Sequence, residues 1–253
     1  MFDDLKGLRV LVTGASTGIG AAVAKGFAAE GCRVAVHYNA SADAAKAVVE
    51  AIGAAGGDAK SLAGDLSRRG EAERVVADAV TLLGGLDVLV NNAGALVRRA
   101  MLEEIDDILI DQVFDLNVRQ LTHACRAALP HLRKNAGTII NTGSIAGRHG
   151  GGPGAGVYAA AKAWVQSFTR NLAKEFAADG IRVNAVAPGV IYTPFHERFS
   201  TPDQLETMRK TIPMGRLGTP EECVGAYLFL ASKAAAGYIT GQVIEVNGGQ
   251  LMP

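Results

Sequence analysis

Residues 13–20 read TGASTGIG and are the most informative stretch of this chain about its fold. They lie between a short β-branched run, which predicts a strand near residues 8–13, and the alanine-rich stretch GIGAAVAKGFAAEG, whose apolar spacing predicts a helix. Gly14, Gly18 and Gly20 allow a tight turn that brings backbone N–H groups and a helix N-terminus close to a phosphate. The stretch therefore predicts a dinucleotide-binding turn. The alternative is a glycine-rich turn selected for its geometry alone.

The alternation of strand and helix continues along the chain. Further strands are predicted near residues 33–37, 59–63, 86–91, 137–143, 181–187 and 242–246. Six helical segments lie between the strands, including a long one over about 106–133 and another over 156–179. The predicted fold class is α/β: a single-domain Rossmann fold with a doubly wound, parallel seven-stranded sheet and helices on both faces. It covers residues 1–253, with a substrate lid at about 190–214.

Composition excludes several classes of function. The 25 basic and 25 acidic residues leave no net charge, so we expect neither nucleic acid nor a membrane surface as partner. Cys32, Cys125 and Cys223 are isolated in apolar surroundings, and we expect buried thiols and no metal site. The acidic N-terminus does not resemble a signal peptide, and no apolar run approaches the length of a membrane span. We expect a cytoplasmic protein that acts on a small molecule.

The residues that follow the second and third strands bear on the choice of cofactor, because ligands bind beyond the carboxyl ends of parallel strands. Tyr38 stands where an NAD-selective protein would carry a carboxylate. His37, Asn39 and Ser41 offer hydrogen-bond donors without negative charge. This favours NADP(H), with NAD(H) or dual use as the alternative. Asp65 could accept from the adenine amino group or cap the next helix.

Two further polar positions follow the fourth strand. Asn92, Ala93 and Gly94 put small residues where a cofactor ribose would approach, although an ordinary Asn/Gly turn explains them equally well. Asn117 is a polar residue inside an apolar helical pattern, which a satisfied core amide would also explain.

The stretch GVYAAAKAW, residues 156–164, places a phenol and an ammonium on one helix face, since Tyr158 and Lys162 are four residues apart. A nearby cation, together with an oxidised nicotinamide, lowers the pKa of a phenol and makes tyrosine a workable acid/base near neutral pH. Ser144, at the end of the fifth strand, could bind the same substrate oxygen. A lysine that extends to solvent beside a packing tyrosine is the alternative.

These motifs together resemble the short-chain dehydrogenase/reductase family over essentially the whole chain. TGASTGIG, NNAG, Asn117, Ser144, YAAAK, VNAVAPGVIYT and TGQVIEVNGG occur in the family's order. The resemblance implies a catalytic tetrad in which Tyr158 is the acid/base, Ser144 polarises the substrate oxygen, Lys162 lowers the pKa of Tyr158 and holds the ribose, and Asn117 supports a proton-relay water. The cofactor contacts expected from the turns and from the resemblance are Gly14, Ser16, Thr17, Gly18, Ile19, Gly20, Tyr38, Asn39, Asp65, Leu66, Asn92, Ala93, Gly94, Tyr158, Lys162, Pro188, Gly189, Ile191 and Thr193.

The chain departs from the family pattern at two places. Thirteen residues separate Ser144 from Tyr158, one more than is usual in the family, and a glycine-rich loop absorbs the excess. Thr17 and Ala40 replace basic residues common in members that prefer NADP, which makes dual cofactor use plausible.

The predicted reaction is reversible NAD(P)(H)-dependent hydride transfer between nicotinamide and a secondary alcohol or ketone. The substrate could be a small ketone, a sugar or polyol, or a 3-oxoacyl thioester. The chain is similar to 3-oxoacyl-carrier-protein reductases, but Asn135 and Asp179 replace their docking arginines, which weakens that choice. The alternative from another class is a catalytically idle dinucleotide-binding sensor or scaffold. The resemblance also implies a homotetramer.

Candidate substrate contacts come from three segments: the loop at 94–101, the glycine-rich loop and the lid. An apolar underside of the lid is expected from Phe195, Phe199, Met208 and Met214. Polar contacts could come from Arg98, Arg99, Arg148, His149 and His196, for each of which a solvated rim is the alternative.

Overall fold

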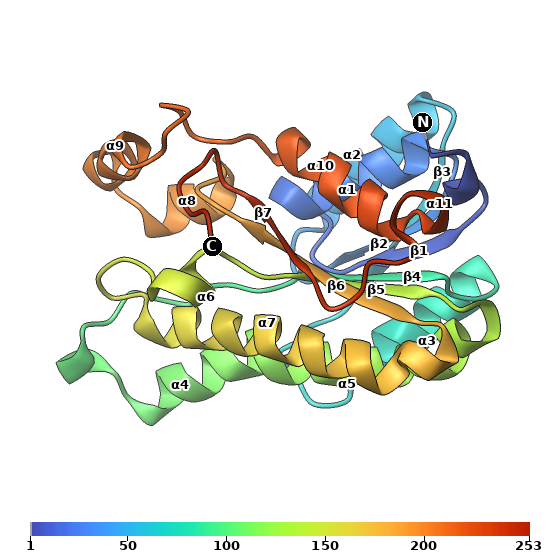
Figure 1. Ribbon diagram of the computed structural model, residues 1–253, viewed down its shortest axis with the longest axis horizontal. Coiled ribbons are helices and arrows are strands. Elements are labelled where there is room, and N and C mark those ends of the chain that lie inside the picture. The colour runs from blue at the N-terminus through green and yellow to red at the C-terminus, as the bar shows by residue number, and fades with distance from the viewer. Residues whose placement is uncertain (1) are drawn as a thin grey trace.

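A parallel sheet of seven strands forms the centre of the computed structural model, which describes residues 2–253 (Figure 1). The strand order is β3-β2-β1-β4-β5-β6-β7, and every neighbouring pair is parallel. The order reverses between β1 and β4, so a crevice opens there beyond the carboxyl ends of the strands. The strands are β1 (Arg9–Val12), β2 (Arg33–Tyr38), β3 (Asp58–Ala63), β4 (Val88–Asn91), β5 (Thr138–Thr142), β6 (Arg182–Pro188) and β7 (Val243–Val246).

Helices cover both faces of the sheet (Figure 1). One layer contains α1 (Gly18–Ala29), α2 (Ala42–Ala54), α10 (Pro220–Ala231) and the short α11 (Lys233–Ala236). The other contains α3 (Glu71–Leu83), α4 (Asp107–Phe114), α5 (Gln120–Leu132) and α7 (Gly156–Phe176). The remaining helices, α6 (Ala146–His149), α8 (Pro194–Phe199) and α9 (Pro202–Lys210), gather at one end of the molecule, at the left of Figure 1.

The strand residues divide between two cores because successive side chains point to opposite faces of a sheet. Val10 and Val12 of β1 pack in the core under α1 and α10, whereas Leu11 packs in the core under α3, α5 and α7. All three are fully buried. Apolar residues on both sides of the strands explain why the strand runs are continuous rather than alternating.

The predicted fold class is confirmed, and every strand lies within two residues of its predicted bounds. The prediction of only six helices was wrong, because α6, α8, α9 and α11 are additional short helices. The long helix expected over 106–133 is present but contains a π-helical turn at Asp115–Arg119, between α4 and α5. The three cysteines are buried. Within residues 2–253 no helix has the length and apolarity needed to cross a membrane.

Candidate active site

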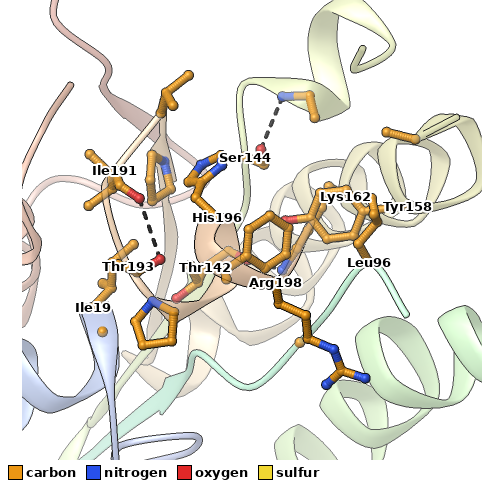
Figure 2. A pocket seen from close by; sticks show the side chains of 18 of the residues that line it. Ile19, Leu96, Thr142, Ser144, Tyr158, Lys162, Ile191, Thr193, His196 and Arg198 are labelled. Atoms are coloured by element: carbon orange, nitrogen blue, oxygen red, sulfur yellow. Dashed lines mark hydrogen bonds between the residues drawn. The ribbon is translucent and has the colours of Figure 1, made fainter. Parts of the chain in front are cut away.

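A cavity of about 980 Å³ opens at the carboxyl ends of the strands. The glycine-rich turn after β1 lines one part of it, and Ser144, Tyr158 and Lys162 line another. Residues of α8 and α9 also line it, so the segment predicted as a lid lies at the cavity; Figure 2 shows His196 and Arg198 of α8 there. The cavity is large enough for a dinucleotide and a small substrate together.

The glycines of the turn after β1 have separate geometric roles. Gly14 has a φ of 61°, a conformation that costs a glycine little. A Cβ on Gly20 would lie 2.2 Å from the carbonyl oxygen of Gly14, so helix α1 could not begin this close to the turn with any other residue. Asn92 Nδ2 donates to the carbonyls of Thr13 and Gly14, each at 3.0 Å, and joins this turn to the end of β4. The backbone is thereby fixed for close approach to a pyrophosphate.

The end of β2 differs from the prediction. His37 was expected to offer a donor to the cofactor, but its ring is buried with both nitrogens engaged. Its Nδ1 accepts from the Gly14 N–H at 3.0 Å, which leaves the proton on Nε2, 3.0 Å from the Gly64 carbonyl. Burial lowers the pKa of His37 to about 4, so the ring is neutral at pH 7. His37 therefore supports the glycine-rich turn.

Tyr38 and Asp65 do not line the cavity, although both were predicted as cofactor contacts. Tyr38 packs against the apolar core because it is the last residue of β2. Asp65 Oδ1 accepts from the backbone N–H and hydroxyl of Ser67, and its other oxygen pairs with Arg68 at 3.2 Å. It does not cap α3 either, since the residue before that helix is Gly70.

Tyr158 lies at the catalytic end of the cavity, with Lys162 one turn further along α7 (Figure 2). Ser144, just beyond β5, also lines the cavity, and its Oγ accepts from the Ala146 N–H at 3.1 Å. Burial raises the pKa of Tyr158 to about 12, and the Ser144 side chain opposes this in part. The lowered pKa was expected with an oxidised nicotinamide bound, and it stays a prediction for that state. Neither the buried Lys162 nor Ser144 overcomes the desolvation of the phenolate.

Asn117 occupies the π-helical turn between α4 and α5. Its Nδ2 donates to the carbonyls of Ala95 and Val113, both at 2.8 Å, while its Oδ1 is buried without a protein partner. A Cβ on Gly94 would lie 2.6 Å from that oxygen and 3.2 Å from Lys162 Nζ. Asn117 does not line the cavity. Its Oδ1 nevertheless faces the region between Gly94 and Lys162. A water there would find both a donor and an acceptor.

Sequence reasoning missed Gln166. Its Nε2 donates to the backbone carbonyl of Ser144 at 2.7 Å, so it fixes the chain that carries the serine. It is buried on the same face of α7 as Lys162. The signal was available, because Tyr158, Lys162 and Gln166 form one series with a spacing of four.

The apolar candidates for substrate contact on the lid do not all lie at the cavity. Phe195 lines the cavity and lies 5.8 Å from the Tyr158 ring, centroid to centroid, whereas Phe199 packs 5.0 Å from Phe195 and does not line the cavity. Met208 lines the cavity, but Met214 does not; it is exposed and borders a smaller pocket.

Of the five polar residues predicted as substrate contacts, three line the cavity and two do not. Arg98 pairs with Asp106 at 3.0 Å and Arg148 with Glu245 at 2.8 Å, and neither lines the cavity. Arg99, His149 and His196 do line it.

The structure brings most of the predicted site together. Predicted residues that line the cavity are Gly14, Ser16, Thr17, Gly18, Ile19, Gly20, His37, Asn39, Ser41, Leu66, Asn92, Ala93, Gly94, Ser144, Tyr158, Lys162, Pro188, Gly189, Ile191 and Thr193. Among residues 2–253, no group of three or more His, Cys, Asp or Glu side chains is placed to hold a metal ion.

These residues fit a nicotinamide dinucleotide. The glycine-rich turn and the N-terminus of α1 could hold the pyrophosphate, and Lys162, Pro188 and Gly189 line the same cavity, where they could contact a ribose and the nicotinamide. Thr193, which hydrogen-bonds the Ile191 carbonyl in Figure 2, contacts the position of a Cβ on Gly18, so the segment after β6 closes onto the glycine-rich turn.

Comparison with known proteins agrees with this geometry. Residues 14–250 match the family model described as Enoyl-(Acyl carrier protein) reductase. The chain is 40% identical to 3beta-hydroxysteroid dehydrogenase 1 of Eggerthella lenta, covering 100% of this chain and 97% of that protein. It is 42% identical to a 3-oxoacyl-(acyl-carrier-protein) reductase of Synechocystis sp., covering 96% of each.

A solved structure agrees in fold over the full length. The NADH-dependent reductase A1-R', described as responsible for alginate metabolism and solved in complex with NAD, superposes with a TM-score of 0.90. In that complex it is 44% identical, and the match covers 100% of both chains.

Proposed function

The chain belongs to the short-chain dehydrogenase/reductase family, and on that premise we propose that Tyr158 is the acid/base of a reversible hydride transfer between a nicotinamide cofactor and a secondary alcohol or ketone. Members of this family named above are oxidoreductases acting on hydroxyl or keto groups, and this chain is one as well. The observation that supports the role of Tyr158 is its place on the cavity wall together with Ser144 and Lys162, whose ammonium lies 5.7 Å from the centre of the tyrosine ring.

In the direction of ketone reduction, Tyr158 gives its proton to the carbonyl oxygen and Ser144 donates a hydrogen bond to the same oxygen. In the direction of alcohol oxidation, Tyr158 takes the hydroxyl proton. The bound nicotinamide supplies or accepts the hydride. Because burial holds the pKa of Tyr158 at about 12, the tyrosine is protonated at neutral pH without cofactor and is ready to act as an acid.

Lys162 and Asn117 complete the proposed tetrad. Burial lowers the pKa of Lys162 to about 8, so the ammonium is still charged at pH 7 and lies 5.7 Å from the centre of the Tyr158 ring. Its charge favours the phenolate that forms when Tyr158 gives up a proton. The unpartnered Oδ1 of Asn117 supports a water-mediated path that returns a proton toward Lys162.

The cofactor is a nicotinamide dinucleotide, and we propose that it is NADP(H) in preference to NAD(H), with dual use as the alternative. Asn39, Ala40 and Ser41 line the cavity after β2 without a carboxylate that would repel a 2′-phosphate. No arginine or lysine lines that part of the cavity either. The relative A1-R' is named as NADH-dependent, which supports the second choice.

For the substrate, we propose a small ketone or its alcohol, of the sugar or polyol type, in preference to a 3-oxoacyl thioester. Asp179 and Asn135 replace the docking arginines of carrier-protein reductases. In the structure Asp179 accepts from Arg133 at 2.8 Å, so a carboxylate occupies that surface. A relative named for alginate metabolism also supports a sugar-derived substrate.

We also propose a homotetramer. Ile108 and Ile110 of α4 and Leu102 just before it are exposed, and such a group of large apolar side chains is typical of a surface that another subunit covers. Light scattering after gel filtration would give the assembly mass directly.

An activity panel tests the proposed function. The absorbance of NADPH and of NADH is followed with small ketones, keto acids, sugars and acyl thioesters, and the reverse reaction with polyols and hydroxy acids. Turnover with one class identifies both substrate class and cofactor. Tight cofactor binding without turnover on any class would favour the idle sensor or scaffold instead.

A further inference from the structure

Arg99 joins three segments that border the substrate part of the cavity. It lies in the loop after β4, and its Nε donates to the carbonyl of Phe199 in α8 at 2.8 Å. Its Nη1 donates to the carbonyl of Pro153 in the glycine-rich loop at 2.9 Å. These partners are 100 and 54 residues away in sequence. A solvated rim residue would not make such contacts, so Arg99 is a fixed part of the wall.

Some of the N–H donors of the Arg99 guanidinium are not used by these carbonyls. Only two of the five N–H groups of an arginine are used by these carbonyls, and no carboxylate of residues 2–253 pairs with it. Arg98 next to it has a carboxylate partner in Asp106. A half-buried cation without a counter-ion is costly, so a ligand that brings negative charge would be favoured.

The charge of Arg99 affects the protonation of His196, a residue of the lid helix α8. His196 lines the cavity, and its pKa is lowered to about 4, first by burial and second by the charge of Arg99. His196 is therefore neutral at pH 7 and adds no second charge. The only carboxylate that lines the cavity among the described residues is Asp203 in α9, whereas Arg198 adds another cation at the rim.

The backbone that carries Arg99 is strained two residues earlier. Val97 has a φ of 69°, a conformation in which a β-branched side chain is an outlier. Strain of this kind persists where the surrounding structure holds it, and it is concentrated at ligand-binding positions. The strained residue lies in the same loop as Arg99, which is bonded to both α8 and the glycine-rich loop.

We propose that Arg99 is a specificity-determining residue that binds a carboxylate on the substrate, so that within the proposed class of small ketones and alcohols this enzyme prefers a keto acid or hydroxy acid to its neutral counterpart. The proposal rests on the proposed function and names its substrate class. A guanidinium fork matches a carboxylate with paired hydrogen bonds, and a single fixed arginine suits a monoanion. A carboxylate at Arg99 also contacts the groups that hold the lid against the glycine-rich loop.

Binding is measured without turnover, so that this proposal and the proposed function fail separately. The protein is saturated with oxidised NAD or NADP, whichever binds more tightly, and titrated calorimetrically with 4-oxopentanoate and 5-oxohexanoate, each against its neutral methyl ester. An oxidised cofactor cannot reduce a ketone, so only affinity is read. The wild type is expected to bind a keto acid roughly ten- to a hundredfold more tightly than its ester, the range for a hydrogen bond to a charged group.

Three variants assign that preference. Arg99→Gln should bring the acid-to-ester ratio close to one, and Arg99→Lys should keep a reduced preference because the charge stays but the fork is lost. Arg98→Gln removes the same charge one residue away and should leave the ratio unchanged. The proposal is overturned if the wild type binds acid and ester equally well or does not bind a keto acid. It is also overturned if the acid-to-ester ratio is unchanged in Arg99→Gln. The wild-type comparison decides even if an Arg99 variant does not fold.

Discussion

The Nζ of Lys162 donates to the carbonyl oxygen of Thr142 at 2.8 Å. This bond ties α7 to the end of β5 and points a buried ammonium at the cavity. Among residues 2–253 no carboxylate pairs with Lys162, and burial alone accounts for its lowered pKa of about 8. The fold therefore carries an uncompensated charge at the site, which a purely structural lysine would avoid.

Replacing Lys162 with an uncharged residue should make the protein more stable and less active. Lys162→Met should raise the free energy of unfolding at pH 7 by roughly 1–3 kcal/mol, because it removes a poorly solvated ammonium. It should also lower turnover by at least about a hundredfold. The native pKa lies below the unfolded one, so the cost of Lys162 fades as the pH rises through about 8. Urea denaturation at pH 7 and pH 10 should therefore show a smaller gain at the higher pH, and a loss of stability in the variant would contradict this account.

Gly20 should not accept a side chain. In Gly20→Ala the new methyl group would lie 2.2 Å from the Gly14 carbonyl oxygen and 2.5 Å from Asn92 Nδ2, so the turn must move. We expect cofactor affinity to fall at least about tenfold, as measured by the fluorescence of reduced nicotinamide. Gly53→Ala in α2 is the matched control, because nothing lies within 4 Å of its Cβ position. It should leave cofactor affinity unchanged and stabilise the helix by up to about 1 kcal/mol. Equal effects of the two changes would refute the close-packing argument.

The sheet was predictable because both sides of each strand are buried and glycines mark the turns. The Tyr158, Lys162 and Ser144 cluster was predictable for a similar reason: helical spacing and the ends of parallel strands place those residues. The lid was not predictable as two helices, because Pro194 and Pro202 each begin a short helix with little buried apolar surface. The role of His37 was also hidden, since its partner Gly64 is 27 residues away.

Acid should destabilise the protein through His37. Its native pKa of about 4 lies below the unfolded value of 6.5, so the unfolded chain binds the proton first. Stability is therefore lost as the pH falls from about 6.5 toward 4, by roughly 2 kcal/mol at pH 5 from this residue. Denaturation at pH 7 and pH 5 should show that loss, and His37→Asn should make it smaller. His196 contributes in the same direction, so the variant should retain part of the slope. An unchanged slope in His37→Asn would show that the ring is protonated in the folded protein.

Adding one positive charge after β2 should shift the cofactor preference from NADH toward NADPH. Ala40 lines the cavity and is exposed, so Ala40→Arg can present a guanidinium without disturbing the core. It should raise affinity for NADPH relative to NADH by roughly tenfold, as a charge-assisted bond to the 2′-phosphate would. Ala40→Gln controls for side-chain length and should change the ratio much less. An equal gain for both cofactors would show that the 2′-phosphate lies elsewhere.

Turnover in Tyr158→Phe shows whether the Tyr158 hydroxyl supplies the proton. The substrate found by the activity panel is used, and NADPH and NADH affinities are measured in parallel by fluorescence. Removing only the hydroxyl should lower turnover by about two to four orders of magnitude while cofactor affinity stays close to that of the wild type. Turnover within a few-fold of the wild type would contradict the account, because the proton would then come from another group.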